Sequence, residues 1–279
     1  MTALSDFARR AKDGHAESVT ALRLGVVSYL NAEPLVYGLA GEARFRLERD
    51  VPSRVAERLH AGESDLGMIP SIEYAFGDYA IVPGVAIASH GPVRSVNLYH
   101  QTSLAGIRRV ALDTSSRTSV ALLKVLLHER LGRDPEYLQV PPSVPAMLAI
   151  ADAALVIGDA ALYFEGQVPR LDLGEEWQAL TGLPFVFAFW AGPRGALAAG
   201  DVARLQRALQ EGLTAVPRIA SEYGVRGGGH EQANESYLRS NIVYALGEDE
   251  LRGLGEFYRR AHAQGLIPSV PEVRFYGDR

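Results

Sequence analysis

Two stretches of the sequence indicate the fold most clearly, LGVVSYLNAEP (residues 24–34) and VALDTSSRTSV (residues 110–120). Each begins as an apolar strand and runs directly into the polar start of a helix. A second pair of similar segments is SDLGMIPSIEY (64–74) and ADAALVIGDAALY (151–163). Each has a small residue and an Asp, followed by an apolar strand, a turn and the start of a helix. Short apolar strands that alternate with helices are typical of α/β folds with a mostly parallel sheet. Two copies of this two-part plan favour two similar α/β lobes.

The positions of these segments predict a discontinuous division of the chain. We expect residues 21–101 and 188–279 to form one lobe and residues 102–187 the other, with residues 1–20 as a disordered polar leader. Ligands of open α/β sheets bind at the carboxyl ends of strands. Each of the four quoted segments turns polar at such an end, so we expect them to converge on a cleft between the lobes.

The composition excludes several classes of protein. The 28 Lys and Arg and the 33 Asp and Glu give a net charge of −5, so no overall basic field attracts nucleic acid or an anionic membrane. The chain has no Cys, and its seven His show no metal-ligand spacing. We therefore expect neither a metal ion nor a cofactor. Residues 1–20 are charged throughout and lack an apolar segment, which predicts a cytoplasmic location.

Hydroxyl groups crowd the helix start in DTSSRTS (113–119). Ser116, Thr118 and Ser119 stand where free backbone N–H groups and the positive end of a helix dipole favour an anion. We interpret this segment as a binding site for a carboxylate or phosphate. The simpler alternative is a helix cap, because Ser and Thr are common N-cap residues. Arg117 either adds a contact to the anion or bridges to a neighbouring carboxylate.

Other polar residues lie at or beside the ends of apolar strands. They are Ser28 and Asn31 in VSYLNAEPL, Ser71 after MIP, Ser95 on an alternating strand at 93–100, and Asp159 in VIGDAAL. The amide of Asn31 both donates and accepts, which suits a ligand hydroxyl or carboxylate. The alternatives are a turn or cap for Asn31, Ser71 and Asp159, and a solvent-facing strand position for Ser95.

The segments GVVSYLNAEPL, GESDLGMIPSIEY, GPVRSV, ALDTSSRTSVALLKVLL and ALVIGDAAL resemble the chorismate dehydratase family of the futalosine route to menaquinone. The resemblance implies a fold similar to that of type II periplasmic binding proteins, with two α/β lobes joined by a hinge. It also implies a hydro-lyase that converts chorismate to 3-[(1-carboxyvinyl)oxy]benzoate. Two alternatives remain: the sister family of 1,4-dihydroxy-6-naphthoate synthases on the same scaffold, and a non-catalytic protein that binds a small anion.

The resemblance also assigns roles to the matching residues. It implies that Asn31 and Ser95 contact the reacting centre. We expect the substrate to be bound by Ser28, Ser71, Ser116, Thr118, Ser119 and Asp159. These motifs contain no convincing His, Lys or Glu base, and the family implies that the side-chain carboxylate of chorismate removes the proton. The task of the protein is then to position its substrate.

Overall fold

The computed structural model describes residues 21–227 and 229–278, so the leader expected at residues 1–20 lies outside the described part. Its strands form two five-stranded sheets. The first sheet contains β1 (Leu22–Val27), β2 (Phe45–Asp50), β3 (Leu66–Pro70), β4 (Tyr79–Ser89) and β10 (Phe185–Pro193). The second contains β5 (Val96–His100), β6 (Arg109–Asp113), β7 (Glu136–Val140), β8 (Ala153–Ile157) and β9 (Arg170–Asp172).

The two sheets share one topology, with strand orders β2-β1-β3-β10-β4 and β7-β6-β8-β5-β9. In the first, β1 pairs in parallel with β2 and β3, as β6 pairs with β7 and β8 in the second. One strand in each sheet, β10 or β5, is antiparallel to both of its neighbours. The paired sequence segments supply equivalent strands, β1 with β6 and β3 with β8. The prediction of two similar α/β units is therefore confirmed.

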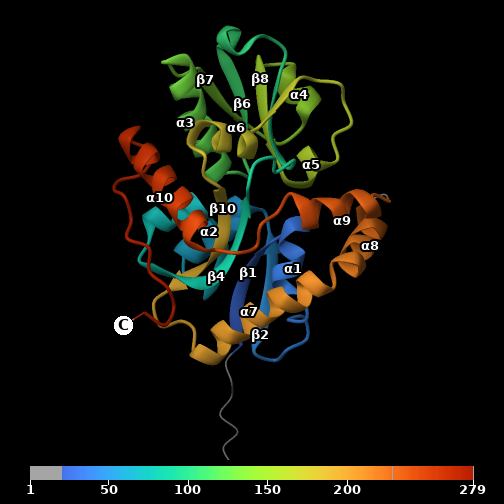
Figure 1. The fold of residues 1–279 in the computed structure, drawn as a ribbon, viewed down its shortest axis with the longest axis vertical. Coiled ribbons are helices and arrows are strands. Elements are labelled where there is room, and N and C mark those ends of the chain that lie inside the picture. The colour runs from blue at the N-terminus through green and yellow to red at the C-terminus, as the bar shows by residue number, and fades with distance from the viewer. Residues whose placement is uncertain (1–20, 228, 279) are drawn as a thin grey trace, which may run out of the picture.

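Each sheet carries its own helices, and we call a sheet with these helices a lobe (Figure 1). The helices of the first lobe are α1 (Glu33–Val36), α2 (Pro52–His60), α7 (Ala199–Thr214), α8 (Val216–Gly227), α9 (Glu231–Ser240) and α10 (Glu248–Ala263), with the 3-10 turns η1 (Leu30–Ala32) and η2 (Ser71–Phe76). Those of the second are α3 (Thr118–Leu131), α4 (Val144–Leu148), α5 (Gly158–Leu162) and α6 (Leu173–Thr181), with η3 (Leu104–Gly106). No helix within the described residues is long and apolar enough to cross a membrane.

The chain crosses between the sheets twice, and the expected lobe boundaries at residues 101/102 and 187/188 do not match these crossings. Strand β5 pairs with β8 and β9 in the second sheet, although it ends at His100. Strand β10 already begins at Phe185 and pairs with β3 and β4 in the first sheet. The apolar pattern of a segment predicts a strand, but its partners lie far away in the sequence and decide which sheet it joins.

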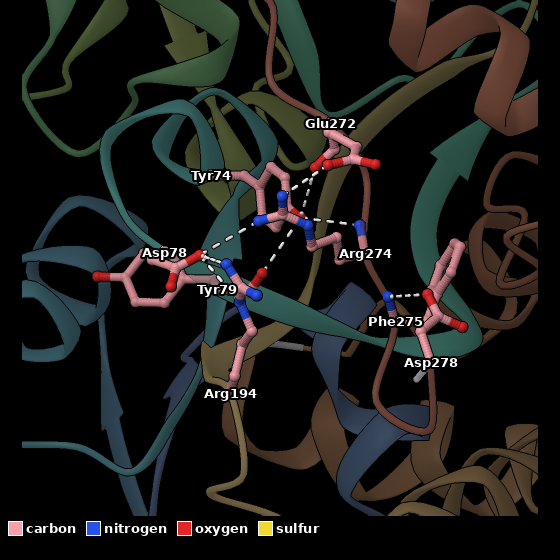
Figure 2. A network of polar contacts seen from close by, with 8 residues as sticks. All are labelled: Tyr74, Asp78, Tyr79, Arg194, Glu272, Arg274, Phe275 and Asp278. Carbon is pink, nitrogen blue, oxygen red and sulfur yellow. Dashed lines mark hydrogen bonds and ion pairs between the residues drawn. The ribbon is translucent and has the colours of Figure 1, made fainter.

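The C-terminal segment returns to the first sheet and covers its edge strand β4. Phe275 forms a β-bridge with Ile81. Figure 2 shows the polar contacts around this segment: the backbone N–H of Arg274 donates to the Tyr74 hydroxyl at 3.0 Å, and the Arg274 guanidinium lies 3.4 Å from Asp78. A covered edge strand cannot pair with another chain.

Candidate functional site

A cavity between the lobes lies where β1, β3, β6 and β8 end. Its lining includes Val27 at the end of β1, Pro70 at the end of β3 and Ile157 at the end of β8, together with residues 116–119 after β6. About 530 Å³ of its space is free of protein atoms, a volume that includes open solvent at its mouth. The expected convergence of the four strand ends is therefore found.

This cavity brings together five of the predicted site residues. They are Asn31, Ser95, Ser116, Thr118 and Ser119. Asn31 follows β1 in the first lobe, and Ser95 immediately precedes β5 at the crossing between the lobes. The other three belong to the start of α3 in the second lobe. Residues separated by as many as 88 positions in the sequence thus share one cavity.

Three predicted substrate-binding residues do not line the cavity. The side chain of Ser28 is exposed, and the Ser71 hydroxyl donates to the carbonyl of Val186 at 2.7 Å. The carboxylate of Asp159 accepts from the backbone N–H of Leu30 at 3.3 Å and from the Tyr223 hydroxyl. The side chains of Ser28, Ser71 and Asp159 therefore do not belong to the lining of the cavity.

The capping alternative for Ser116 is wrong. Helix α3 begins at Thr118 after the N-cap residue Arg117, and no side chain caps it. Thr118 Oγ1 accepts instead from the backbone N–H of Ile72 at 3.1 Å, across the boundary between the lobes. The first N–H groups of a helix have no acceptor within it, and the buried hydroxyls of Ser116 and Ser119 lie beside them. This end of α3 can therefore bind a carboxylate.

Asp113 shapes the loop that leads into α3. One oxygen of its buried carboxylate accepts from the N–H of Ser115 at 2.8 Å and from its hydroxyl at 2.6 Å. The other accepts from the N–H of Ile157 at 3.2 Å. Burial raises the pKa of this carboxyl. Asp113 thus ties the end of β6 to the end of β8 and fixes the loop, while Ser115 contacts Tyr29 at 3.1 Å.

Tyr29 crosses the cavity from the first lobe and packs on Gly158 of the second. A methyl group at Gly158 would lie 2.7 Å from the Tyr29 ring, and Gly158 has a φ of +63°. Only glycine satisfies both conditions without strain. Burial raises the pKa of Tyr29 to about 12, so its hydroxyl is neutral near pH 7.

Arg117 bridges to carboxylates of the first lobe, which is the second of its two predicted roles. Its guanidinium lies 2.8 Å from Glu57 and 3.2 Å from Glu73. Among the described residues that line the cavity, Arg117 and Tyr29 are the only ionisable side chains. No group of three His, Asp or Glu in the described part of the chain could hold a metal ion.

Tyr237 of helix α9 connects Asn31 with Ser95, and the sequence interpretation missed it. The Asn31 amide donates to the Tyr237 hydroxyl at 3.2 Å, which in turn donates to Ser95 Oγ at 2.7 Å. Burial raises the pKa of Tyr237, which is 1% exposed. Asn31 Oδ1 is also buried and has no hydrogen-bond partner among the described residues. A bound ligand can supply the missing donor.

Two similar lobes with a cavity between them define a periplasmic-binding-protein-like fold. A solved structure of an Archaeoglobus fulgidus protein has a TM-score of 0.73 at 18% identity and covers 88% of this chain and 98% of its own. The alkanesulfonate-binding protein SsuA from Xanthomonas axonopodis pv. citri, solved with bound MOPS, has a TM-score of 0.67 at 18% identity, with 89% of this chain and 94% of its own covered. At this identity the likeness shows the fold alone.

The sequence comparisons identify the family. A family model described as menaquinone biosynthesis matches residues 22–263. A Thermus thermophilus protein named chorismate dehydratase is 36% identical over 273 residues, which cover 89% of this chain and 96% of that protein. A Streptomyces coelicolor 1,4-dihydroxy-6-naphthoate synthase is 25% identical and covers 79% of this chain and 83% of its own length. The chain belongs to the menaquinone biosynthesis family.

Proposed function

We propose that this protein is a cytoplasmic chorismate dehydratase, a hydro-lyase that forms 3-[(1-carboxyvinyl)oxy]benzoate on the futalosine route to menaquinone. One observation carries the proposal: Asn31, Ser95 and the hydroxyl-rich start of α3 line a single cavity. The 36% identity to the Thermus thermophilus chorismate dehydratase supports the choice of substrate, against 25% to the naphthoate synthase.

The chemistry of the cavity suits a doubly negative substrate. Chorismate carries one carboxylate on its ring and one on its enolpyruvyl side chain. The hydroxyls of Ser116 and Ser119 and the N–H groups at the start of α3 donate hydrogen bonds without adding negative charge. Such interactions strengthen in a cavity with little water. A protein with a net charge of −5 can therefore bind a dianion locally.

The reaction removes a proton from C3 of the ring and a hydroxide from C4. The electrons of the C3–H bond form the new ring double bond as the C4–O bond breaks, and the proton and hydroxide leave together as one water. The product ring is aromatic, so the overall step is strongly favourable and the enzyme has only to lower its barrier.

The described side chains that line the cavity include no carboxylate, imidazole or amine that could serve as the base. This composition supports the scheme in which the enolpyruvyl carboxylate of chorismate itself accepts the C3 proton. The protein then holds that carboxylate close to C3 and stabilises the departing hydroxide, for which Asn31 and Ser95 are the candidates.

An assay with purified protein and chorismate tests the proposal. We expect chorismate to be consumed without added metal or nucleotide and an aromatic enol ether of the expected mass to form. Conversion of the cyclic futalosine derivative in a parallel reaction, with chorismate untouched, would indicate a naphthoate synthase. Recovery of unchanged chorismate bound to the protein would indicate a binding protein, and either result would overturn the proposal.

A further inference from the structure

The hydrogen bonds between Asn31, Tyr237 and Ser95 run in one direction. Asn31 Nδ2 can only donate, so the Tyr237 oxygen accepts from it at 3.2 Å. The Tyr237 proton is then free to be donated to Ser95 Oγ, at 2.7 Å. Because Ser95 Oγ already accepts this bond and lines the cavity, its own proton is left to donate to a ligand.

We propose that Tyr237 is a positioning residue that turns the Ser95 hydroxyl into a hydrogen-bond donor toward the departing hydroxide. A hydroxyl that accepts a hydrogen bond is a better donor, because successive hydrogen bonds polarise one another in a medium of low dielectric constant. Tyr237 itself does not line the cavity, so it acts through Ser95. This inference rests on the proposed dehydratase function.

The same bonds orient Asn31. Its Nδ2 is held by Tyr237, which leaves the buried, unpartnered Oδ1 to accept a hydrogen bond. With both carboxylates ionised, the ring hydroxyl is the only hydrogen-bond donor of chorismate. Asn31 Oδ1 thus accepts from this hydroxyl while Ser95 donates to it. Such a pair recognises a hydroxyl at C4, and the bond donated by Ser95 stabilises its oxygen as the C4–O bond breaks.

Burial favours a neutral Tyr237 over a proton-transfer role. Its ring is almost fully buried, and burial raises the pKa of its hydroxyl. The hydroxyl therefore stays protonated near pH 7 and acts as a fixed donor. The carboxylate of Asp159 also influences Tyr237 electrostatically, but it is bound by Tyr223 and Leu30 rather than by Tyr237.

A double-mutant cycle with Tyr237→Phe, Ser95→Ala and the double variant tests this inference on the whole protein. Removing the hydroxyl of Tyr237 leaves Ser95 free to rotate its proton away from the cavity. We expect kcat for chorismate to fall about tenfold to a hundredfold while KM changes less than about threefold. In the Ser95→Ala background the same change should lower kcat clearly less than it does in the wild type, because only its effect through Asn31 is left.

Tyr99→Phe is the matched control. Tyr99 is fully buried and its hydroxyl donates to the carbonyl of Ala161 at 3.2 Å, but it does not line the cavity. We expect this variant to keep the kcat of the wild type, so that loss of a buried tyrosine hydroxyl alone is excluded as the cause. Thermal unfolding of all variants checks that they are folded.

The outcomes separate the inference from the proposed function. A wild-type protein that does not dehydrate chorismate overturns both. If the wild type is active, either of two results would overturn the positioning role alone. In the first, Tyr237→Phe keeps the kcat of the wild type. In the second, the factors by which Tyr237→Phe and Ser95→Ala lower kcat multiply in the double variant. Should Tyr237→Phe fail to fold, 3-fluorotyrosine at position 237 replaces it. This more acidic donor should change kcat more when Ser95 is present than when it is absent, and equal effects in both backgrounds would overturn the inference.

Discussion

At the scale of single residues, the site binds charge with neutral groups. The side chains of Ser95, Ser116 and Ser119 can donate hydrogen bonds, and Asn31 Oδ1 can accept one, without carrying charge. Arg117, the one cation among the described residues of the lining, is already paired with Glu57 and Glu73. Affinity for a dianion therefore depends on how accurately the donors are placed, and small changes at single positions should have large effects.

The side chains of Asn31 and Ser95 provide the first prediction. We expect Asn31→Ala and Ser95→Ala each to lower kcat/KM for chorismate by tens- to thousands-fold, because each loses a contact to the departing hydroxyl worth about 2–4 kcal/mol in the transition state. Ser103→Ala, at an exposed position in the second lobe, should behave as the wild type. Steady-state kinetics measure all three, and near-wild-type activity in both site variants would remove these residues from the mechanism.

Gly158 provides a prediction that separates packing from backbone strain. Gly158→Ala places a methyl group 2.7 Å from the Tyr29 ring at a φ of +63°, whereas Gly62→Ala meets only the strain of a φ of +70° with no atom within 4 Å. We expect Gly62→Ala to lower the free energy of unfolding by about 1–2 kcal/mol. Gly158→Ala should lower it further and also reduce turnover. Equal effects of the two changes on stability and activity would contradict this packing.

The sequence identified five residues of the cavity. Four of them follow parallel strands, whose carboxyl ends share one edge of a sheet, and Ser95 reaches the same edge because it precedes the antiparallel strand β5. It could not identify Tyr237. Its place in an amphipathic helix predicts only that it is buried, and its partner Ser95 lies 142 positions away. Nor could it exclude Ser28 and Ser71, because whether a strand end faces the cavity or a neighbouring carbonyl depends on side-chain packing.

At the scale of elements, a buried carboxylate, Asp113, and a partly buried one, Asp159, hold strand ends and helix starts together. Asp113 joins β6 to β8, and Asp159 at the start of α5 accepts from η1 and from Tyr223 of α8. Both have a raised pKa because they are buried. Each costs some stability when ionised and serves to fix the geometry around the cavity.

Asp159 predicts a pH dependence of stability. Because its pKa is raised in the folded protein, the folded state binds a proton more readily than the unfolded chain does. As the pH falls through the pKa of the folded state, the free energy of unfolding of the wild type should therefore rise relative to that of Asp159→Asn. This difference should level off below about pH 4, near the pKa of Asp in the unfolded chain. Urea unfolding of both proteins between about pH 4 and about pH 8 measures the difference. A difference that falls with decreasing pH would contradict the burial of an ionised carboxylate.

Element boundaries were predictable where the sequence pattern was uninterrupted. Strands β1, β3, β6 and β8 follow clean apolar runs and lie where they were expected. Strand β4 was not predicted, because Pro83 and Gly84 interrupt its run. It tolerates them as an edge strand with a register shift against β10, and Gly84 adopts a φ of +75°. Tertiary pairing thus overrides a local signal that normally ends a strand.

At the scale of the whole molecule, hydrogen bonds join the two lobes on either side of the cavity. The N–H of Ser53 donates to the carbonyl of Ser115 at 3.0 Å, and the Tyr163 hydroxyl in the second lobe donates to Asn234 of α9 at 2.8 Å. Figure 1 shows α9 beside α5, where this second contact forms. We expect these contacts to form as the lobes close on a substrate, so that closure contributes to binding.

Tyr163 tests the contribution of closure. Tyr163→Phe removes one contact of the closed state and changes no residue that lines the cavity. A hydrogen bond contributes about 0.5–1.5 kcal/mol, so KM for chorismate should rise between about twofold and tenfold with little change in kcat. The fall in affinity for the product, measured by calorimetry, should match the rise in KM. A variant with lower kcat and unchanged KM would show that this contact does not act through closure.

The position of the bound product is the most direct test of the whole account. A crystal structure of the protein with 3-[(1-carboxyvinyl)oxy]benzoate should place one carboxylate at the start of α3, within hydrogen-bond reach of Ser116 and Ser119. The ring carbon that carried the hydroxyl should face Asn31 and Ser95. Product bound outside this cavity, or inside it with that carbon turned away from both residues, would contradict the account.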